Sequence, residues 1–329
     1  MKKPRVARVV EYDAPGDVDV LEIRERQLPS AGPGEVLVEV VSAGINHIEA
    51  FIRDGREPEW SDEVFPRRSG SDFAGIVVER GSGVAGFAPG TEVVGHVRSG
   101  AHASHVLVSA AALVVKPRSL SWEVAGALYL AGVCALDTLD GLRIGEADTL
   151  VVSAAAGGVG SIEVQLARHA GATVIGTCGE RNFDYLRQLG IRPVQYGEGI
   201  ADRIRAAAPN GVTAFVDNFG QDGRTLADSL GVPASRYRSS DDRRLLELAA
   251  LEDSPDAVEH GTRQLERLVT LASERAFTLL ISGFYPLDDV REAFDDLVRL
   301  HSRGKVVLGT HPVSAYRVLK AREVHEARP

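Results

Sequence analysis

The chain has 329 residues, of which 44% are hydrophobic and 25% are charged. This length exceeds what one compact core usually holds, so we expect two domains. Its 37 Lys and Arg residues face 46 Asp and Glu residues, and the net charge of -9 argues against nucleic acid or an anionic membrane as the main partner.

The first part of the chain has the pattern of a mostly β domain. Short strand-like runs alternate there with glycine, proline and acidic turns. Strands are expected at residues 6–10, 35–41, 75–79, 92–94 and 104–108.

After Ser121 the pattern changes to helices that alternate with apolar strands, which predicts a parallel sheet with crossover helices. The strands are expected at residues 149–153, 173–176, 194–196 and 214–217. Residues 236–264 are charge-rich and helical in pattern. From Phe277 a strand, an amphipathic helix and a last strand at 305–308 indicate a return to the first domain. The helix should bury Leu287, Val290, Phe294 and Leu297.

A glycine turn follows the strand that ends at Ser153. The turn, residues 154–161, reads Ala-Ala-Ala-Gly-Gly-Val-Gly-Ser. A pyrophosphate can approach the backbone N–H groups of a helix N-terminus where Gly157 and Gly160 carry no side chain. The following helix should bury the face that holds Val159, Ile162, Leu166 and Ala170, and end at Gly171. Such a turn can also serve packing alone, but its strand–turn–helix context predicts a dinucleotide site.

Five segments occur in a fixed order along the chain: Ser-Ala-Gly-Ile-Asn at 42–46, Gly-Ser-Asp-Phe-Ala-Gly at 70–75, Leu-Ala-Gly at 130–132, the glycine turn, and Arg-Gly-Lys-Val-Val-Leu at 303–308. Together they resemble the medium-chain dehydrogenase/reductase superfamily, in its zinc-free quinone oxidoreductase (zeta-crystallin-like) branch. The resemblance covers nearly the whole length. It implies an α/β protein with a GroES-like catalytic domain (1–120 and 266–329) and a doubly wound Rossmann domain (121–265), with nicotinamide and substrate in the cleft between them.

Zinc-dependent relatives place a cysteine after the first core strand and a His-Glu pair in the next glycine segment. Here those stretches carry Asn46-His47 and Ser71-Asp72, and the cysteine-rich lobe for structural zinc is missing. We therefore expect no metal. A different site from His96, His102 and His105 stays conceivable because imidazoles suit zinc and copper, although no thiolate is nearby.

Without a Lewis acid, alcohol–ketone interconversion loses its main electrophile. Hydride addition to a quinone or an enone needs only hydrogen-bond donors for the phenolate or enolate that results. The resemblance thus implies an NADPH-dependent reductase of quinones or α,β-unsaturated carbonyl compounds, with a small-molecule substrate.

The resemblance places three residues at the substrate end. The Asn46 amide is a candidate donor to a developing oxyanion, and a turn asparagine is the alternative. His47 is a candidate proton donor or simply a packed histidine. Phe51 stands where relatives commonly have a tyrosine, so the proton comes from His47, Tyr129 or water, or the substrate differs, or the activity is weak.

The resemblance also implies the cofactor contacts. They are Cys134, Ala156, Gly157, Gly158, Val159, Gly160, Thr177, Arg181, Tyr196, Asn218 and Arg303. Cys134 replaces the family's threonine, and a buried structural cysteine is its alternative. Arg303 and Lys305 are each candidates for a cofactor contact or for capping the last strand, and capping is favoured for Lys305.

Cofactor choice depends on the loop after the second strand of the parallel sheet. Arg181 can clamp a 2′-phosphate, and Tyr196 matches the tyrosine that NADP-using relatives place beside it. Glu180 has the spacing of an acidic residue that binds the ribose of NAD, so the signals conflict. NADPH is favoured over NADH.

The remaining expectations concern the location, the assembly and the role of the protein. Two cysteines, too few for a disulfide framework, and the lack of a signal-peptide or membrane-span pattern indicate a cytoplasmic protein. A homodimer should form through an edge strand of the Rossmann sheet. A non-catalytic NADP(H)-binding regulatory protein and a biosynthetic tailoring enzyme stay open, and Arg67-Arg68 could suit an acidic substrate or be solvated.

Overall fold

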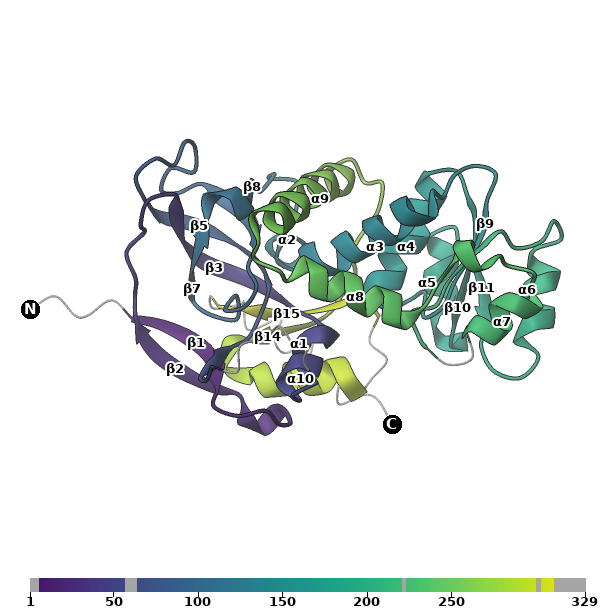
Figure 1. The fold of residues 1–329 in the computed structure, drawn as a ribbon, viewed down its shortest axis with the longest axis horizontal. Coiled ribbons are helices and arrows are strands. Elements are labelled where there is room, and N and C mark those ends of the chain that lie inside the picture. Colours follow the sequence, from purple (N-terminus) through teal and green to yellow (C-terminus); the bar gives the residue numbers. More distant parts are fainter. Residues whose placement is uncertain (1–5, 57–63, 221–222, 300–302, 311–329) are drawn as a thin grey trace, which may run out of the picture.

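The computed structural model describes residues 6–56, 64–220, 223–299 and 303–310, and two lobes lie side by side in it (Figure 1). One lobe contains strands from both ends of the chain, and the other contains the middle of the chain. The predicted fold class, a mostly β domain combined with a parallel α/β domain, is confirmed.

The first lobe has two sheets. A three-stranded sheet has the order β2-β1-β4, and a larger one has the order β14-β15-β3-β5-β6-β8, with β7 also paired to β3. The strands are β1 (Val6–Tyr12), β2 (Glu22–Gln27), β3 (Glu35–Ile45), β4 (Arg67–Arg68), β5 (Asp72–Arg80), β6 (Glu92–His96), β7 (His105–Ser109), β8 (Leu113–Val115), β14 (Ile281–Pro286) and β15 (Lys305–Gly309). The five strands expected early in the chain are present, and most are longer than predicted.

After the second lobe the chain adds two more strands to the larger sheet of this lobe. Strand β15 pairs antiparallel with the end of β3, with Val306 opposite Ile45. Strand β14 begins at Ile281, four residues later than the start expected at Phe277. The predicted apolar face of the helix is buried, with Leu287 in a short turn just before α10 (Val290–Arg299).

The second lobe has a five-stranded parallel sheet of order β11-β10-β9-β12-β13. Its strands are β9 (Thr149–Val152), β10 (Thr173–Cys178), β11 (Arg192–Gln195), β12 (Ala214–Val216) and β13 (Tyr237–Arg238). Strand β9 lies between β10 and β12, which is the point where strand order reverses. Ligands of such sheets bind outside the carboxyl ends of the strands at this point.

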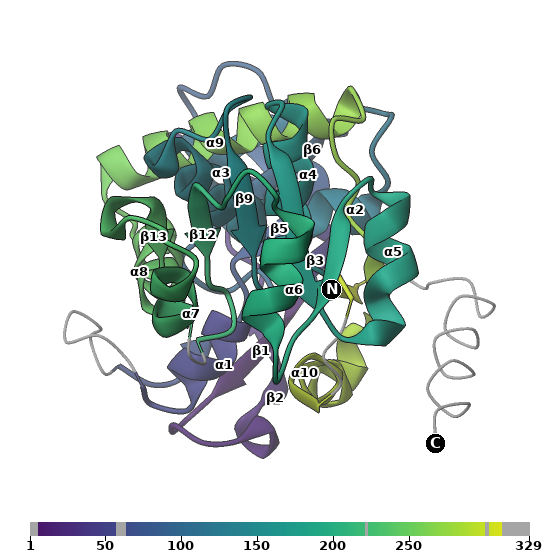
Figure 2. The ribbon, with the colours of Figure 1, turned by 90° about the vertical axis from the view of Figure 1, so that its right-hand side faces the viewer.

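Helices pack against this sheet and against the first lobe (Figure 2). They are α1 (His47–Arg53), α2 (Trp122–Gly126), α3 (Tyr129–Leu142), α4 (Gly158–His169), α5 (Phe183–Gln188), α6 (Ile200–Ala207), α7 (Gly223–Ser229), α8 (Ser240–Ala250) and α9 (Pro255–Ser273), besides α10. Helix α4 buries Val159, Ile162 and Leu166 as predicted. Ala170 is instead exposed and follows the last helical residue, His169, because the chain turns away there and Gly171 has a φ of +92°.

The charge-rich stretch 236–264 contains β13 and two helices. Ser239 accepts a hydrogen bond from the Asp242 N–H at the start of α8. Ser254 does the same for Ala257 at the start of α9, whose first residue is proline. Local capping therefore decides these boundaries, which apolar periodicity alone leaves open.

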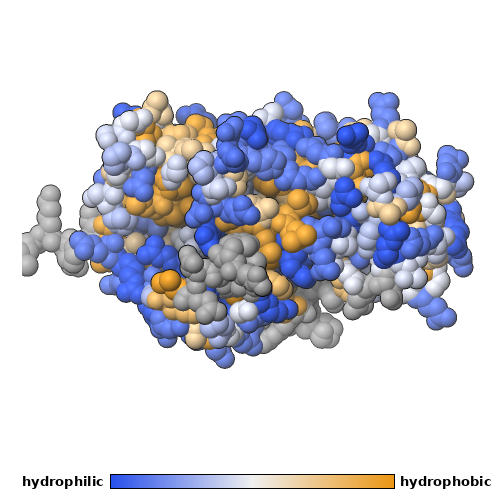
Figure 3. All heavy atoms as spheres, in the orientation of Figure 1, coloured by the Kyte–Doolittle hydropathy of each residue, from blue (hydrophilic) through white to orange (hydrophobic). Residues whose placement is uncertain are grey.

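The outer face of the molecule is mixed. In Figure 3 hydrophilic residues predominate, and hydrophobic residues gather in separate groups. None of the helices in the described ranges is both long and apolar enough to cross a lipid bilayer.

Candidate active site

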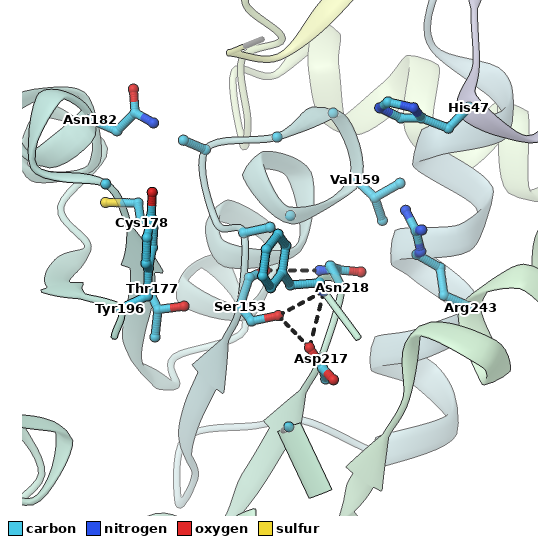
Figure 4. Close-up of a pocket in the computed structure, with 18 of the residues that line it drawn as sticks. His47, Ser153, Val159, Thr177, Cys178, Asn182, Tyr196, Asp217, Asn218 and Arg243 are labelled. Atoms are coloured by element: carbon cyan, nitrogen blue, oxygen red, sulfur yellow. Dashed lines mark hydrogen bonds between the residues drawn. The ribbon is translucent and has the colours of Figure 1, made fainter. Parts of the chain in front are cut away.

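A cleft of about 1040 Å³ lies where the two lobes meet (Figure 4). Residues after β9, β10 and β12 line it from the second lobe. The junction of β3 with α1, the start of β15 and helix α8 line it from other directions. A volume of this size suits an extended ligand together with a small molecule.

The glycine turn forms the middle of the cleft wall. Helix α4 begins at Gly158, and Gly157 precedes it without a side chain to cap the first N–H groups. A Cβ on Gly160 would lie 2.6 Å from the carbonyl oxygen of Ala154. The turn therefore requires glycine at 160 for its own close packing, and it leaves backbone N–H groups at a helix N-terminus for an anion. Gly304 N–H donates to Ala156 O at 2.9 Å, which ties the turn to β15.

The loop after β12 is held beside this turn by side-chain hydrogen bonds. Ser153 Oγ donates to Asp217 Oδ1 at 2.8 Å, and the N–H of Phe219 donates to the same carboxylate oxygen at 3.0 Å. Asn218 Nδ2 donates to Glu163 Oε2 at 2.6 Å. These contacts fix Asn218 in the cleft wall near Val159 (Figure 4).

Glu163 is a fully buried carboxyl group on α4. Burial raises its pKa to about 7, although the hydrogen bond from Asn218 and the charge of Arg243 act in the opposite direction. Its Oε1 has no hydrogen-bond partner among the described residues. The position thus carries an ionisable group whose charged form the surroundings disfavour.

One end of the cleft contains the residues that the sequence predicts to lie beside the 2′-phosphate of NADPH. Thr177, Arg181 and Tyr196 line it, whereas the exposed Glu180 does not. Arg303 lies behind them: its Nε donates to Asn182 Oδ1 at 2.5 Å, and its Nη2 donates to the carbonyl oxygen of Arg181.

The other end of the cleft contains a buried lysine. Lys305 Nζ donates to Ile45 O at 2.9 Å and to Asn46 Oδ1. The lysine is 3% exposed. It was expected to cap the last strand, but its ammonium reaches across to the start of α1 and lines the cleft.

Asn46 is fixed by this lysine and by two neighbours. Its Nδ2 donates to Glu49 Oε1 at 3.3 Å and lies 3.5 Å from Ser71 Oγ. Glu49 also accepts hydrogen bonds from the backbone N–H groups of Asn46 and Ser71. The Asn46 amide donors therefore face Glu49 and Ser71, while its oxygen holds Lys305.

His47 projects into the cleft from the first turn of α1 (Figure 4). Water reaches its imidazole, which is exposed on the cleft side. Desolvation by the surrounding protein atoms nevertheless lowers the pKa of His47 to about 4, with smaller contributions from the charges of Arg243 and Lys305. At neutral pH the imidazole is thus an uncharged hydrogen-bond donor and acceptor.

Phe51, Cys134 and Tyr129 lie outside the lining of this cleft. The Phe51 ring lies between the guanidinium groups of Arg56 and Arg244, each 4.8 Å from its centre. Cys134 is fully buried, and burial raises the pKa of its thiol. Tyr129 donates its hydroxyl proton to Ala250 O at 2.8 Å, which directs it away from substrate chemistry.

The three histidines considered for a metal have separate partners. His96 lies 3.0 Å from Thr262 Oγ1, and His102 lies 3.0 Å from Ser69 Oγ. His105 Nδ1 is 3.0 Å from Ser104 Oγ. Within the described ranges, no group of three or more His, Cys, Asp or Glu side chains is arranged to hold a metal ion.

The cleft brings together eleven of the fourteen residues expected to act. They are Asn46, His47, Ala156, Gly157, Gly158, Val159, Gly160, Thr177, Arg181, Tyr196 and Asn218. The structure adds Arg243 to the cleft lining, places Lys305 there as well, and brings Glu163 behind that lining through the hydrogen bond from Asn218. In the sequence, Lys305 and Glu163 are single charged residues within apolar segments. Arg243 is one of several charged residues in a helical segment, and no local pattern distinguishes it.

Two family descriptions match the chain. Residues 32–118 match the alcohol dehydrogenase GroES-like domain, and residues 158–236 match the family described as zinc-binding dehydrogenase. The chain is 29% identical to quinone-oxidoreductase QR1, chloroplastic, of Triphysaria versicolor, over 92% of this chain and 98% of the relative.

Two further proteins resemble it. A 2-methylene-furan-3-one reductase of Solanum lycopersicum is 32% identical over 57% of this chain and 51% of the relative. The structure of the mycobacterial protein Rv1454c complexed with NADPH superimposes with a TM-score of 0.76 and 27% identity, over 92% of this chain and 99% of that one.

Replacing Glu163 with Gln tests the buried carboxyl group. A raised pKa means that the folded state holds the proton more tightly than the unfolded state. The contribution of Glu163 to stability is therefore full below about pH 4.5 and is lost as the pH rises through about 7. We expect Glu163→Gln to remove that loss. The free energy of unfolding of the variant minus that of wild type should therefore be about 2 kcal/mol larger at pH 8 than at pH 5, which means that the variant is relatively more stable at pH 8.

Urea unfolding at about pH 5 and pH 8 measures this difference. The exposed Glu266 on α9 supplies the control, since Glu266→Gln should follow the wild-type pH dependence. Parallel pH dependences for wild type and Glu163→Gln would contradict the prediction.

Proposed function

The chain belongs to the medium-chain dehydrogenase/reductase superfamily, in its quinone oxidoreductase-like branch, and we propose that it is a zinc-independent, NADPH-dependent reductase of quinones or α,β-unsaturated carbonyl compounds. The observation that carries the proposal is the cleft itself, where the glycine turn, Asn218, His47 and Lys305 meet. A quinone reductase and an enone reductase among its relatives support the substrate classes.

The cleft residues fit a phosphorylated nicotinamide dinucleotide. The start of α4 offers N–H groups to the pyrophosphate. Arg181 lines the end where a 2′-phosphate would lie, and the competing acid Glu180 is outside the lining. A structural relative was solved with NADPH. These points favour NADPH over NADH.

The residues at the zinc position of relatives do not fit zinc. Asn46 and Ser71 are neutral, the Asp72 carboxyl accepts hydrogen bonds from Ser71 Oγ and the Leu130 N–H, and the Asn46 oxygen already holds the Lys305 ammonium, a fixed positive charge. Both cysteines are buried elsewhere. A divalent cation would have to displace that ammonium, so we propose chemistry that uses hydrogen-bond donors in place of a metal.

Bound NADPH would supply a hydride to the β-carbon of an enone, or to a quinone. The electron pair of the carbon–carbon double bond then moves to the carbonyl oxygen, and the enolate takes one proton at the α-carbon. The uncharged His47 N–H and the Lys305 ammonium are the cleft donors we assign to the developing oxyanion. Asn46 positions Lys305. Because the pKa of His47 is about 4, the proton that ends the reaction comes from water or Lys305 rather than from an imidazolium.

A non-catalytic NADP(H)-binding protein is the second candidate. It is favoured by the placement of Phe51 and Cys134 outside the cleft lining, because neither supplies the group that relatives carry at that position. A biosynthetic tailoring enzyme of the same fold, a reductase or a dehydratase-like enzyme, would use the same cleft with altered chemistry.

Turnover assays distinguish the reductase from the non-catalytic protein. NADPH oxidation should exceed the enzyme-free rate with at least one member of a panel of quinones, enones and enoyl thioesters. Absence of turnover with all three classes, together with tight NADPH binding that Phe51→Tyr and Cys134→Thr leave unchanged, would favour the non-catalytic protein.

Cofactor choice is tested at Arg181. Arg181→Gln should weaken NADPH binding about tenfold and leave NADH binding unchanged, because only NADPH carries the 2′-phosphate that the guanidinium pairs with. Fluorescence titration measures both affinities. Arg187→Gln, which alters an exposed arginine paired with Asp184 on α5, is the matched control. Equal losses for both cofactors would overturn the assignment.

We also propose a cytoplasmic homodimer that pairs through an edge strand of the five-stranded sheet. The edges of that sheet are β11 and β13. Light scattering should give twice the chain mass of 35.2 kDa. A monomer mass would end this proposal without affecting the proposed reaction.

A further inference from the structure

Helix α8 places an incompletely paired arginine in the cleft wall. Arg243 lines the cleft, and its Nε is buried without a hydrogen-bond partner among the described residues. Its ion pair is loose, with Nη1 3.7 Å from Glu247 Oε1. A guanidinium has five N–H donors, and a buried donor without an acceptor costs free energy. The geometry therefore calls for an acceptor that the described residues do not provide.

Two cations lie at this end of the cleft. Arg243 and Lys305 both act on His47 and on Glu247, so the two cations lie close to the same end. His47 is uncharged at neutral pH. The charge of Arg243 acts on two buried carboxyl groups, Glu247 and Glu163, and burial raises the pKa of both, which weakens the negative charge opposite the guanidinium.

The cofactor's own anionic groups belong elsewhere in the cleft. The pyrophosphate fits the turn at Gly157–Gly160, and the 2′-phosphate fits the end at Arg181. Figure 4 shows Thr177 and Tyr196 on one side of the cleft, and His47 with Arg243 on the opposite side. The nicotinamide, which reaches furthest from the phosphates, ends in a neutral carboxamide. An anion at Arg243 must therefore come from the second ligand.

We propose that Arg243 binds an acidic group of the substrate, so that the natural substrate is an α,β-unsaturated carbonyl compound that also carries a carboxylate. This inference rests on the proposed function. A carboxylate can accept two parallel hydrogen bonds from a guanidinium, which the loose contact with Glu247 does not supply. The bound acid would lie beside His47 and direct the alkene toward the turn.

Other arginines considered for an acidic substrate have different partners. Arg68 Nε donates to Glu11 Oε1 at 3.3 Å, and the Arg67 guanidinium lies over the Phe65 ring. Both belong to β4, which pairs with β1. Arg244, next to Arg243, is paired with Asp241 at 3.0 Å and stacks on Phe51. Arg243 alone of these four lines the cleft.

A matched pair of substrates tests the proposal. 4-Oxo-4-phenyl-2-butenoic acid and its methyl ester present the same enone, and only the acid is charged. Wild type should favour the acid by about tenfold or more in kcat/KM, as a charge-assisted pair predicts. Arg243→Gln should lose that preference through a higher KM for the acid, so that acid and ester are turned over with similar kcat/KM. Arg244→Gln should keep the preference.

A binding measurement makes the test independent of turnover. The saturated acid, 4-oxo-4-phenylbutanoic acid, should raise the Tm of the wild-type NADP⁺ complex, and its methyl ester should not. Arg243→Gln should abolish the rise and leave NADPH affinity unchanged, and Arg243→Lys should restore part of it.

Three outcomes would overturn the proposal: no acid preference in wild type, a preference that survives in Arg243→Gln, or a loss of NADPH affinity in that variant equal to its loss for the acid. The last would make Arg243 a cofactor contact. Turnover of quinones without any acid preference would leave the proposed function intact. If nothing is turned over, the proposed function fails, and the Tm measurement still decides the role of Arg243.

Discussion

The contact between Lys305 and the end of β3 is the interaction on which the site depends. Burying an ammonium costs several kcal/mol unless its N–H groups find acceptors. Ile45 O and Asn46 Oδ1 provide two of them, and both acceptors belong to the segment that carries His47 into the cleft. The last strand of the chain is thus locked to the first core strand, which pairs with it in the same sheet. A displacement of β15 would leave this charge without acceptors, so the register of the two strands and the position of α1 are set together.

This arrangement also decides which groups can act on a substrate. The side-chain oxygen of Asn46 accepts a hydrogen bond from Lys305, and its amide N–H groups face Glu49 and Ser71. We therefore expect Asn46 to position Lys305 rather than to donate to a substrate. The same ammonium contacts Asn46, which stands in the stretch where zinc-dependent relatives are expected to place a cysteine. A protonated amine and a metal ion both supply a fixed positive charge near a developing oxyanion, but the amine is also a proton carrier. That difference fits reduction of activated double bonds, which ends in protonation of carbon.

The sequence predicted those parts of the site that local patterns determine. The glycine turn, the strands β9, β10 and β12, and the amphipathic α10 follow from short-range periodicity and turn chemistry, and the family resemblance supplied the order of the lobes. Lys305 was expected to cap a strand because its partner, Asn46, lies about 260 positions away in the chain. Arg243 was one charge among many in a helix whose buried face only tertiary packing defines. Phe51 was expected near the substrate, but stacking between Arg56 and Arg244 draws its ring out of the cleft lining.

The distribution of charge around the cleft gives these features one explanation. Three buried carboxyl groups, Asp72, Glu163 and Glu247, surround the two cations, and burial raises the pKa of each. Their full ionisation would cancel Lys305 and Arg243 and would repel an anionic dinucleotide. With raised pKa values they hold protons more readily, so the cleft stays receptive to negative charge at both ends. The free energy of unfolding falls at higher pH, where these groups must ionise inside the protein. Apolar side chains at these positions would avoid that loss of stability, so we interpret the three carboxyl groups as part of the proposed anion-binding cleft.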